Sequence, residues 1–192
     1  MGNFKKSKPT SASRLLNRNM NHQLHKQSNP PKRLFHYTKM FHLSEILEDG
    51  LLIQATAGVT GKERPAVWFT EMETPPPCCT PLPVSVYDVP AGRSGTSPLE
   101  LLRPVRFEVK PIVASHDWGS FVKESGITKR MATALFRSAM EDGSHPEKWW
   151  VSFAPVAAAD WLEISIWRNN TWVPIWQEGA APESTKPGSL AA

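Results

Sequence analysis

The chain has few cysteines and no long apolar segment, two features that often assign a protein to a class directly. Its 192 residues include only two cysteines, Cys78 and Cys79, which are adjacent, so they do not bridge each other without strain and cannot form a four-ligand zinc site. No apolar run approaches the ~18 residues that a membrane span needs, and no apolar segment of a secretory signal opens the chain. We therefore expect no membrane span and a reducing, cytoplasmic setting.

Sequence signatures of several catalytic classes are also absent. The chain has no phosphate-binding P-loop, no GxGxxG fingerprint and no GxSxG nucleophile elbow. No group of histidines and acids has the spacing of metal ligands, so we expect no metal site.

Acidic residues are missing from the first 33 positions, which hold eight lysines and arginines. The rest of the chain then has 14 basic and 18 acidic residues, a net charge of −4, although the whole chain carries +4. We interpret residues 1–32 as a flexible basic arm, 33–176 as one folded domain and 177–192 as a disordered tail. Met20 is an alternative start, and the arm also has the composition of an export leader of an effector.

The central region predicts several short strands and few helices, which is an α+β domain. The first helix follows Thr38, which we expect to cap it, and ends at Gly50; a second spans 128–142. Along 104–110 apolar and charged residues alternate, as in a strand with one buried face. The other expected strands are 33–37, 66–70, 149–153, and a hairpin of 162–167 with 171–176 whose Pro174 suggests an edge strand.

The last hairpin holds the strongest functional pattern. Strict alternation places Trp161, Glu163, Ser165 and Trp167 on one face, opposite the aliphatic Leu162, Ile164 and Ile166. A carboxylate and a hydroxyl between two indoles suit a cleft that stacks a flat ring and hydrogen-bonds a sugar. The alternative is a strand face in water with two ordinary surface tryptophans.

A second polar pair interrupts the apolar start of the domain. His36 and Thr38 share one face of the expected strand, with Tyr37 on the other. They suit a cleft that needs polar groups at a rigid edge. The alternative is a half-buried histidine with satisfied hydrogen bonds beside an ordinary helix cap.

Three segments in order, LFHYT with a helix ending LEDGLL, AVWFT, and the late strand with Glu163, resemble the ADP-ribosyltransferase family. The small microbial members, among them DNA-modifying toxins and the RNA 2′-phosphotransferases, are the most similar in pattern. The resemblance implies a split β-sheet core and NAD as a substrate. It implies that Glu163 is the catalytic acid, with Glu147 as a rival because Glu147 precedes the strand 149–153.

The same resemblance implies the residues that bind NAD. His36 would hydrogen-bond a ribose hydroxyl with support from Thr38, and Trp68 would stack on nicotinamide with Thr70 nearby. From the alternation of the last strand, and not from the resemblance, Trp161 and Ser165 would complete the site beside Glu163. The chain departs from the family pattern in EMETPPPCC after the aromatic strand, in Trp68 where tyrosine is usual, and in Trp161 where glutamine or glutamate is frequent.

Three functions remain as hypotheses at this point. The first is an NAD-dependent ADP-ribosyltransferase or NAD glycohydrolase, toxin or effector, whose acceptor is a protein or nucleic acid and whose partner is an antitoxin or immunity protein. The second is a non-catalytic binding or anti-defence module on the same fold. The third is an RNA 2′-phosphotransferase-like enzyme, for which the spacing of Arg64, Arg103 and Arg106 gives no support.

Overall fold

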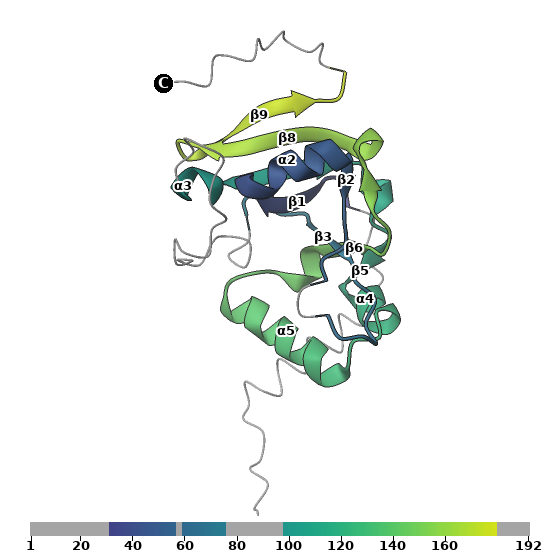
Figure 1. Ribbon diagram of the computed structural model, residues 1–192. Helices are drawn as coiled ribbons and strands as arrows, with labels where there is room; N and C mark the ends of the chain where they lie inside the picture. Colours follow the sequence, from purple (N-terminus) through teal and green to yellow (C-terminus); the bar gives the residue numbers. More distant parts are fainter. Residues whose placement is uncertain (1–30, 57–58, 76–97, 180–192) are drawn as a thin grey trace, which may run out of the picture.

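The computed structural model describes residues 31–56, 59–75 and 98–179 (Figure 1). These residues form an α+β fold around a seven-stranded sheet with the strand order β5-β6-β3-β1-β4-β8-β9, in which neighbouring strands pair antiparallel. The α+β prediction is confirmed. The predictions for the basic arm to residue 30, for the two cysteines and for residues 180–192 of the tail lie outside the described residues.

The strands of the large sheet are β1 (Leu34–Lys39), β3 (Val67–Thr70), β4 (Pro104–Val109), β5 (His116–Asp117), β6 (Trp149–Ser152), β8 (Trp161–Arg168) and β9 (Thr171–Gln177). A second sheet pairs β2 (Leu51–Leu52) with β7 (Val156–Ala157). The α-helices are α2 (Met40–Asp49), α3 (Pro98–Leu101), α4 (Trp118–Glu124) and α5 (Lys129–Glu141). Short 3-10 turns are η3 (Pro111–Val113), η4 (Pro146–Lys148) and η5 (Ala158–Asp160).

The strands and the two helices expected from the sequence are confirmed within a residue or two, whereas α4 was not predicted. At the turn between β8 and β9, Asn169 and Asn170 both have positive φ, as a tight hairpin turn requires. Gly50 ends α2 in the left-handed region at φ 63°, with its N–H donating to the Ile46 carbonyl at 2.9 Å. β9 lies at the edge of the sheet, as Pro174 indicated.

The prediction that Thr38 caps the first helix is wrong. β1 continues through Thr38 to Lys39, which occupies the N-cap position and makes no capping hydrogen bond with its side chain. The Met40 N–H at the start of the helix donates instead to the Arg103 carbonyl at 2.9 Å. A main-chain partner from the neighbouring strand region therefore replaces the local cap that the sequence suggested.

The first core lies under α2, which crosses one face of the sheet near β1 and β8 (Figure 1). Val105, Phe107 and Val109 alternate along β4, and each is 0% exposed. They pack with Leu43 of α2 and with apolar residues of the neighbouring strands. The alternation read from the sequence thus identified the buried side of β4, and we call this side of the sheet the core face.

A second core covers the opposite side of the sheet, but only at its other end. There α4 and α5 gather by β5 and β6 (Figure 1) and bury Trp118, Phe121 and Phe136. Along β6 the side chains divide between the two cores, with Trp150 in the first and Trp149 in the second. Because β3 and β6 contribute side chains to both cores, these two strands are apolar without alternation.

Candidate functional site

β1, β4, β8 and β9 turn their remaining side chains to the side opposite α2, beyond the reach of the second core. The strand register brings these residues into three rows. One row runs from Tyr37 through Arg106 to Ser165, and a second runs from Phe35 through Glu108 and Glu163 to Gln177. The third row is the pair of Trp167 and Trp172. We call this side the polar–aromatic face. Its members are Phe35, Tyr37, Arg106, Glu108, Glu163, Ser165, Trp167, Trp172 and Gln177.

Glu163 lies in the middle of the polar–aromatic face with three hydrogen-bond donors around its carboxylate. Oε1 accepts from Arg106 Nη2 at 3.1 Å and from the Ser165 hydroxyl, and Oε2 accepts from Gln177 Nε2 at 3.0 Å. Burial by itself raises the pKa of Glu163, but the hydrogen bonds from Ser165, Gln177 and Arg106 outweigh it and hold that pKa below the ordinary value. The side chain is 18% exposed, so the face presents an ionised, fixed carboxylate to solvent.

Arg106 is held by aromatic rings from strands on either side of β4. Its guanidinium carbon lies 4.8 Å from the ring centre of Phe35 and 4.7 Å from that of Trp172. Contacts of this kind attract a cation to the face of an aromatic ring. The residue is 7% exposed, and its Nη1 also donates to the Glu73 carbonyl at 3.3 Å.

A second arginine neutralises the other carboxylate of the face. Arg33 grips Glu108 with two hydrogen bonds, Nε to Oε1 at 2.8 Å and Nη2 to Oε2 at 2.7 Å. Its guanidinium carbon lies 4.9 Å from the centre of the Phe35 ring. Glu108 and Glu163 therefore each contact a different arginine, which reduces the repulsion between the two carboxylates.

Residues 71–75, which we call the strap, lie against this face after the end of β3. Tyr37 donates its hydroxyl to the Met72 carbonyl at 2.7 Å, and Trp172 donates its indole N–H to the Glu73 carbonyl at 3.0 Å. The Trp150 indole N–H binds the Glu71 carboxylate at 2.8 Å. Donors from several strands thus fix the strap beside Arg106.

His36 and Thr38 lie on the core face, away from Glu163. The Nδ1 atom of His36 is 2.9 Å from the Trp68 carbonyl oxygen, which only accepts, so Nδ1 carries the proton. The ring meets Phe69 and Phe107 at centroid distances of 6.0 and 6.3 Å. Burial lowers the pKa of His36, and its neighbour His42 lowers it further, against the opposing effect of the Trp68 carbonyl. His36 is therefore a neutral, hydrogen-bonded ring that joins β1 to β3.

Trp68 and Thr70 lie on the same side of the sheet as Glu163, but neither is close enough to contact it. The Trp68 ring packs against Phe121 and Trp149 at centroid distances of 4.6 and 5.7 Å, as part of the second core. Thr70 is 4% exposed, and its hydroxyl accepts from the Met72 N–H at 3.2 Å at the start of the strap. Neither side chain contacts Glu163 in the described hydrogen bonds and ring pairs.

The placement of Trp161 beside Glu163 on one face is wrong. A β-bulge shifts the register, since Glu108 pairs with Glu163 but the next residue, Val109, pairs with Trp161. Leu162 is the extra residue, and it rotates Trp161 onto the core face, where the indole is 3% exposed and lies 5.1 Å from the Phe107 ring. Ser165 does share the face of Glu163, but it is 0% exposed and supports the carboxylate.

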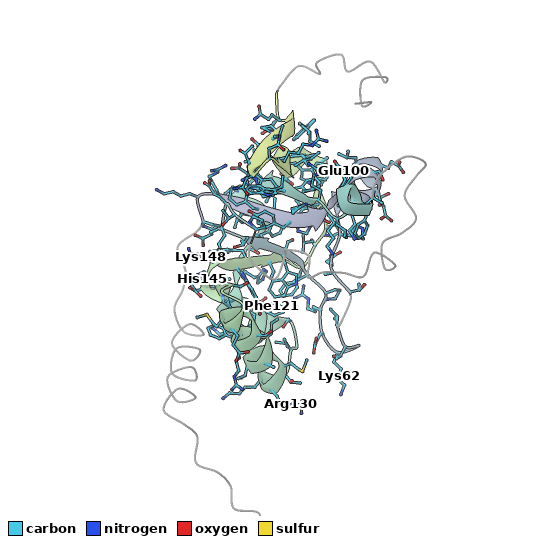
Figure 2. All side chains as sticks on the ribbon, turned by 90° about the vertical axis from the view of Figure 1, so that its left-hand side faces the viewer. Lys62, Glu100, Phe121, Arg130, His145 and Lys148 are labelled. Carbon is cyan, nitrogen blue, oxygen red and sulfur yellow. The ribbon has the colours of Figure 1, made fainter. Side chains whose placement is uncertain are left out.

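The rival acid Glu147 lies in η4, where His145 binds its carboxylate at 3.0 Å. Three strands, β3, β1 and β4, separate the following strand β6 from β8. Glu100 marks the end of β8, because it pairs with Arg168 there. Figure 2 shows His145 and Lys148, which flank Glu147, on the side of α5 and well apart from Glu100. Glu147 and Glu163 therefore cannot act in one site.

Sequence reasoning missed most of the residues that surround Glu163. Arg106 was assigned to the charged side of its strand, but nothing local shows that this side meets Glu163. Gln177 was assigned to the tail, although it ends β9. Phe35, whose ring packs on Arg106, was interpreted as an ordinary strand residue. A register for β4 against β8 was the information needed, and short-range patterns do not contain it.

No family model, no curated protein and no solved structure matches this chain. Within the described residues, no group of three or more histidines, cysteines and acids could hold a metal ion. No helix in the same part of the chain is long and apolar enough to cross a membrane. The polar–aromatic face is the part of the described structure where charged and aromatic side chains meet around a partly exposed carboxylate.

Proposed function

We propose that this domain cleaves the nicotinamide–ribose bond of NAD at the polar–aromatic face, with Glu163 as the catalytic carboxylate. The observation that carries the proposal is the state of Glu163, an ionised carboxylate held by three donors yet still 18% exposed. NAD as the substrate comes from the resemblance of the chain's ordered segments to ADP-ribosyltransferases, and in this proposal the residues of the polar–aromatic face bind it in place of His36 and Trp68.

The reaction places specific demands on such a group. The bond between the ribose carbon and the pyridinium nitrogen breaks, its electron pair stays with the departing nicotinamide, and positive charge grows on the ribose. A fixed anion stabilises that charge, as in glycoside hydrolysis. An acceptor nucleophile or water then forms the new bond to the ribose carbon and loses a proton to solvent.

Aromatic side chains on the same face supply surfaces for flat rings. Trp172 lies 4.9 Å from Trp167 and 5.7 Å from Tyr37, measured between ring centres, and all three share the side of Glu163. Trp167 is half-buried and closes the row towards the hairpin turn. In this proposal these rings take the stacking role that the resemblance gave to Trp68, and His36 holds β1 to β3 instead of touching ribose.

A non-catalytic binding module is the second candidate, and one observation favours it. Both oxygens of Glu163 already have partners within the protein, and the strap occupies donors of Tyr37, Arg106 and Trp172. A 2′-phosphotransferase has less support, because the arginines do not converge. Arg64 stacks on Phe153 at 4.0 Å, and Arg103 pairs with Glu100.

The test is nicotinamide release from NAD by the purified protein, beside Glu163→Gln and Glu147→Gln, with folding checked by circular dichroism. We expect release by the wild type, a loss of about 10²- to 10³-fold in Glu163→Gln, and little change in Glu147→Gln. Equal rates in folded Glu163→Gln and wild type would refute the role of Glu163. A loss confined to Glu147→Gln would move the acid to η4.

A second measurement separates the two candidate functions. If the wild type releases no nicotinamide, NAD is titrated by calorimetry with the same proteins. Heat of binding that weakens in Glu163→Gln would support a binding module for NAD. An absence of any binding heat would remove NAD from the proposal.

A further inference from the structure

Arg106 is buried in a way that hydrogen bonding alone does not compensate. The residue is 7% exposed, and its Nε is buried with no hydrogen-bond partner among the described residues. A buried cation costs free energy unless its N–H groups and its charge are satisfied. Replacing such an ion pair by apolar residues is often neutral or stabilising, so stability is a weak reason for its presence.

The rings around Arg106 fix its direction. Phe35 and Trp172 hold the guanidinium from the two sides of β4, and the Glu73 carbonyl accepts from Nη1. Nη2 then points to Oε1 of Glu163 at 3.1 Å. The two rings therefore fix the guanidinium beside the carboxylate, whereas the arginine of an ordinary surface pair is a long, exposed side chain that must be ordered to form the pair.

The two oxygens of Glu163 differ in their surroundings. Oε1 is held from within the sheet by Arg106 and by Ser165, which face each other across β4 and β8. Oε2 has its partner in Gln177, an exposed residue of the edge strand. A ligand hydroxyl that replaces Gln177 would therefore meet Oε2 while Oε1 stays anchored.

We propose that Arg106 is the positioning residue of Glu163: it anchors Oε1, so that Oε2 serves the ligand. This inference rests on the proposed function, because it assigns the second oxygen to the substrate ribose. It goes beyond that function by giving the two carboxylate oxygens different roles: Oε1 is held by the protein, and Oε2 binds the substrate. Arg106 itself touches no reacting atom.

The other charged groups near Glu163 leave this task to Arg106. Glu108 faces it from β4 but is gripped by Arg33, and Glu73 of the strap also contacts Arg33. Beyond the end of β9, Glu178 pairs with Lys110 at 3.2 Å. Among the described residues, Arg106 is the one cation that contacts the Glu163 carboxylate.

The test compares Arg106→Gln and Arg106→Lys with Arg168→Gln, a matched control at the end of β8 whose arginine pairs with Glu100 at 3.6 Å. We expect Arg106→Gln to lower kcat for nicotinamide release by about 10- to 100-fold, the range for one hydrogen bond to a charged group, with KM changed by less than about threefold. Arg106→Lys should recover part of kcat because it keeps the charge. Arg168→Gln should match the wild type.

A readout that needs no turnover is the carbon-13 titration of the Glu163 carboxyl, assigned by its disappearance in Glu163→Gln. The pKa of Glu163 should rise in Arg106→Gln, rise less in Arg106→Lys and stay unchanged in Arg168→Gln. Unchanged titration in Arg106→Gln, or in Arg106→Lys if the former does not fold, would overturn the proposal, as would an unchanged kcat. Shifted titration with no turnover in the wild type would defeat the proposed function while the anchoring by Arg106 stands.

Discussion

The core face and the polar–aromatic face are built from alternate residues of the same strands, yet they differ in nearly every physical property. On β4, Val105, Phe107 and Val109 are 0% exposed and belong to the first core. Their neighbours Arg106 and Glu108 carry opposite charges and lie among aromatic rings and arginines. In this part of the sheet, one side holds the fold together by burial, and the other arranges charge.

This comparison separates two residues that the sequence had placed in one site. His36 lies on the core face with its ring bound to a main-chain carbonyl, and Glu163 lies on the opposite face with its carboxylate bound to side chains. The burial of His36 favours its neutral form, and the donors around Glu163 favour its charged form. The two residues therefore differ in what their loss should do.

The largest expected difference between the faces is in stability. Phe107→Ala should lower the free energy of unfolding by about 3–5 kcal/mol, because it leaves a cavity between His36, Trp161 and the core. Glu108→Gln, the next residue on the opposite face, should lower it by less, about 1–2 kcal/mol, because it weakens the two hydrogen bonds from Arg33. Urea denaturation measures both. Equal losses would mean that the polar–aromatic face also carries the stability of the sheet.

The second prediction concerns His36. In His36→Phe the Trp68 carbonyl loses its donor, which should cost about 1–3 kcal/mol of unfolding free energy. His36→Gln can still donate and should lose less. Thermal or urea unfolding gives the values, and NAD calorimetry serves as the comparison. A His36→Phe protein of unchanged stability that no longer binds NAD would show that His36 is a ligand-binding residue.

The two residues should also respond to acid in different pH ranges. Unfolded His36 takes up a proton near its ordinary pKa of 6.5, but the folded ring does so only at lower pH, so its contribution to stability falls as the pH drops below 6.5. The pKa of folded Glu163 lies below its ordinary value of 4.5, so its contribution is present above 4.5 and is lost as the pH falls through the folded pKa.

Unfolding curves at a series of pH values separate these contributions. The decline that begins near 6.5 should be weaker in His36→Phe, and the decline below 4.5 should be weaker in Glu163→Gln. If both variants lose the same part of the curve, the assignment of neutral and charged forms to the two faces is incorrect.

The smallest effect on stability is expected when the buried pair is removed as a whole. Arg106→Met combined with Glu163→Leu should leave the free energy of unfolding unchanged within about 1 kcal/mol or raise it, because no charge remains unpaired. Glu163→Leu alone should be less stable than the double variant, since Arg106 then lacks its carboxylate. A double variant that is much less stable than either single one would show that the pair holds the fold.

Much of the secondary structure follows from local patterns. The alternation of 104–109 identified the buried side of β4, the two asparagines after Arg168 marked the hairpin turn, and Gly50 marked the end of α2. These signals act within a few residues, through side-chain periodicity, positive φ and capping. The unpredicted α4 is only seven residues long, too short for a clear helical period.

What the amino-acid sequence determined by itself is therefore which residues share a side of each strand and where each element ends. The tertiary structure decided which strands are neighbours, and with that the meeting of Arg106 and Glu163 from positions 57 residues apart. It also placed the bulge at Leu162 that turned Trp161 into the core, and it set His36 on the side away from Glu163. Pairing register is a property of two distant segments and of the cores that they bury together, so no local pattern contains it.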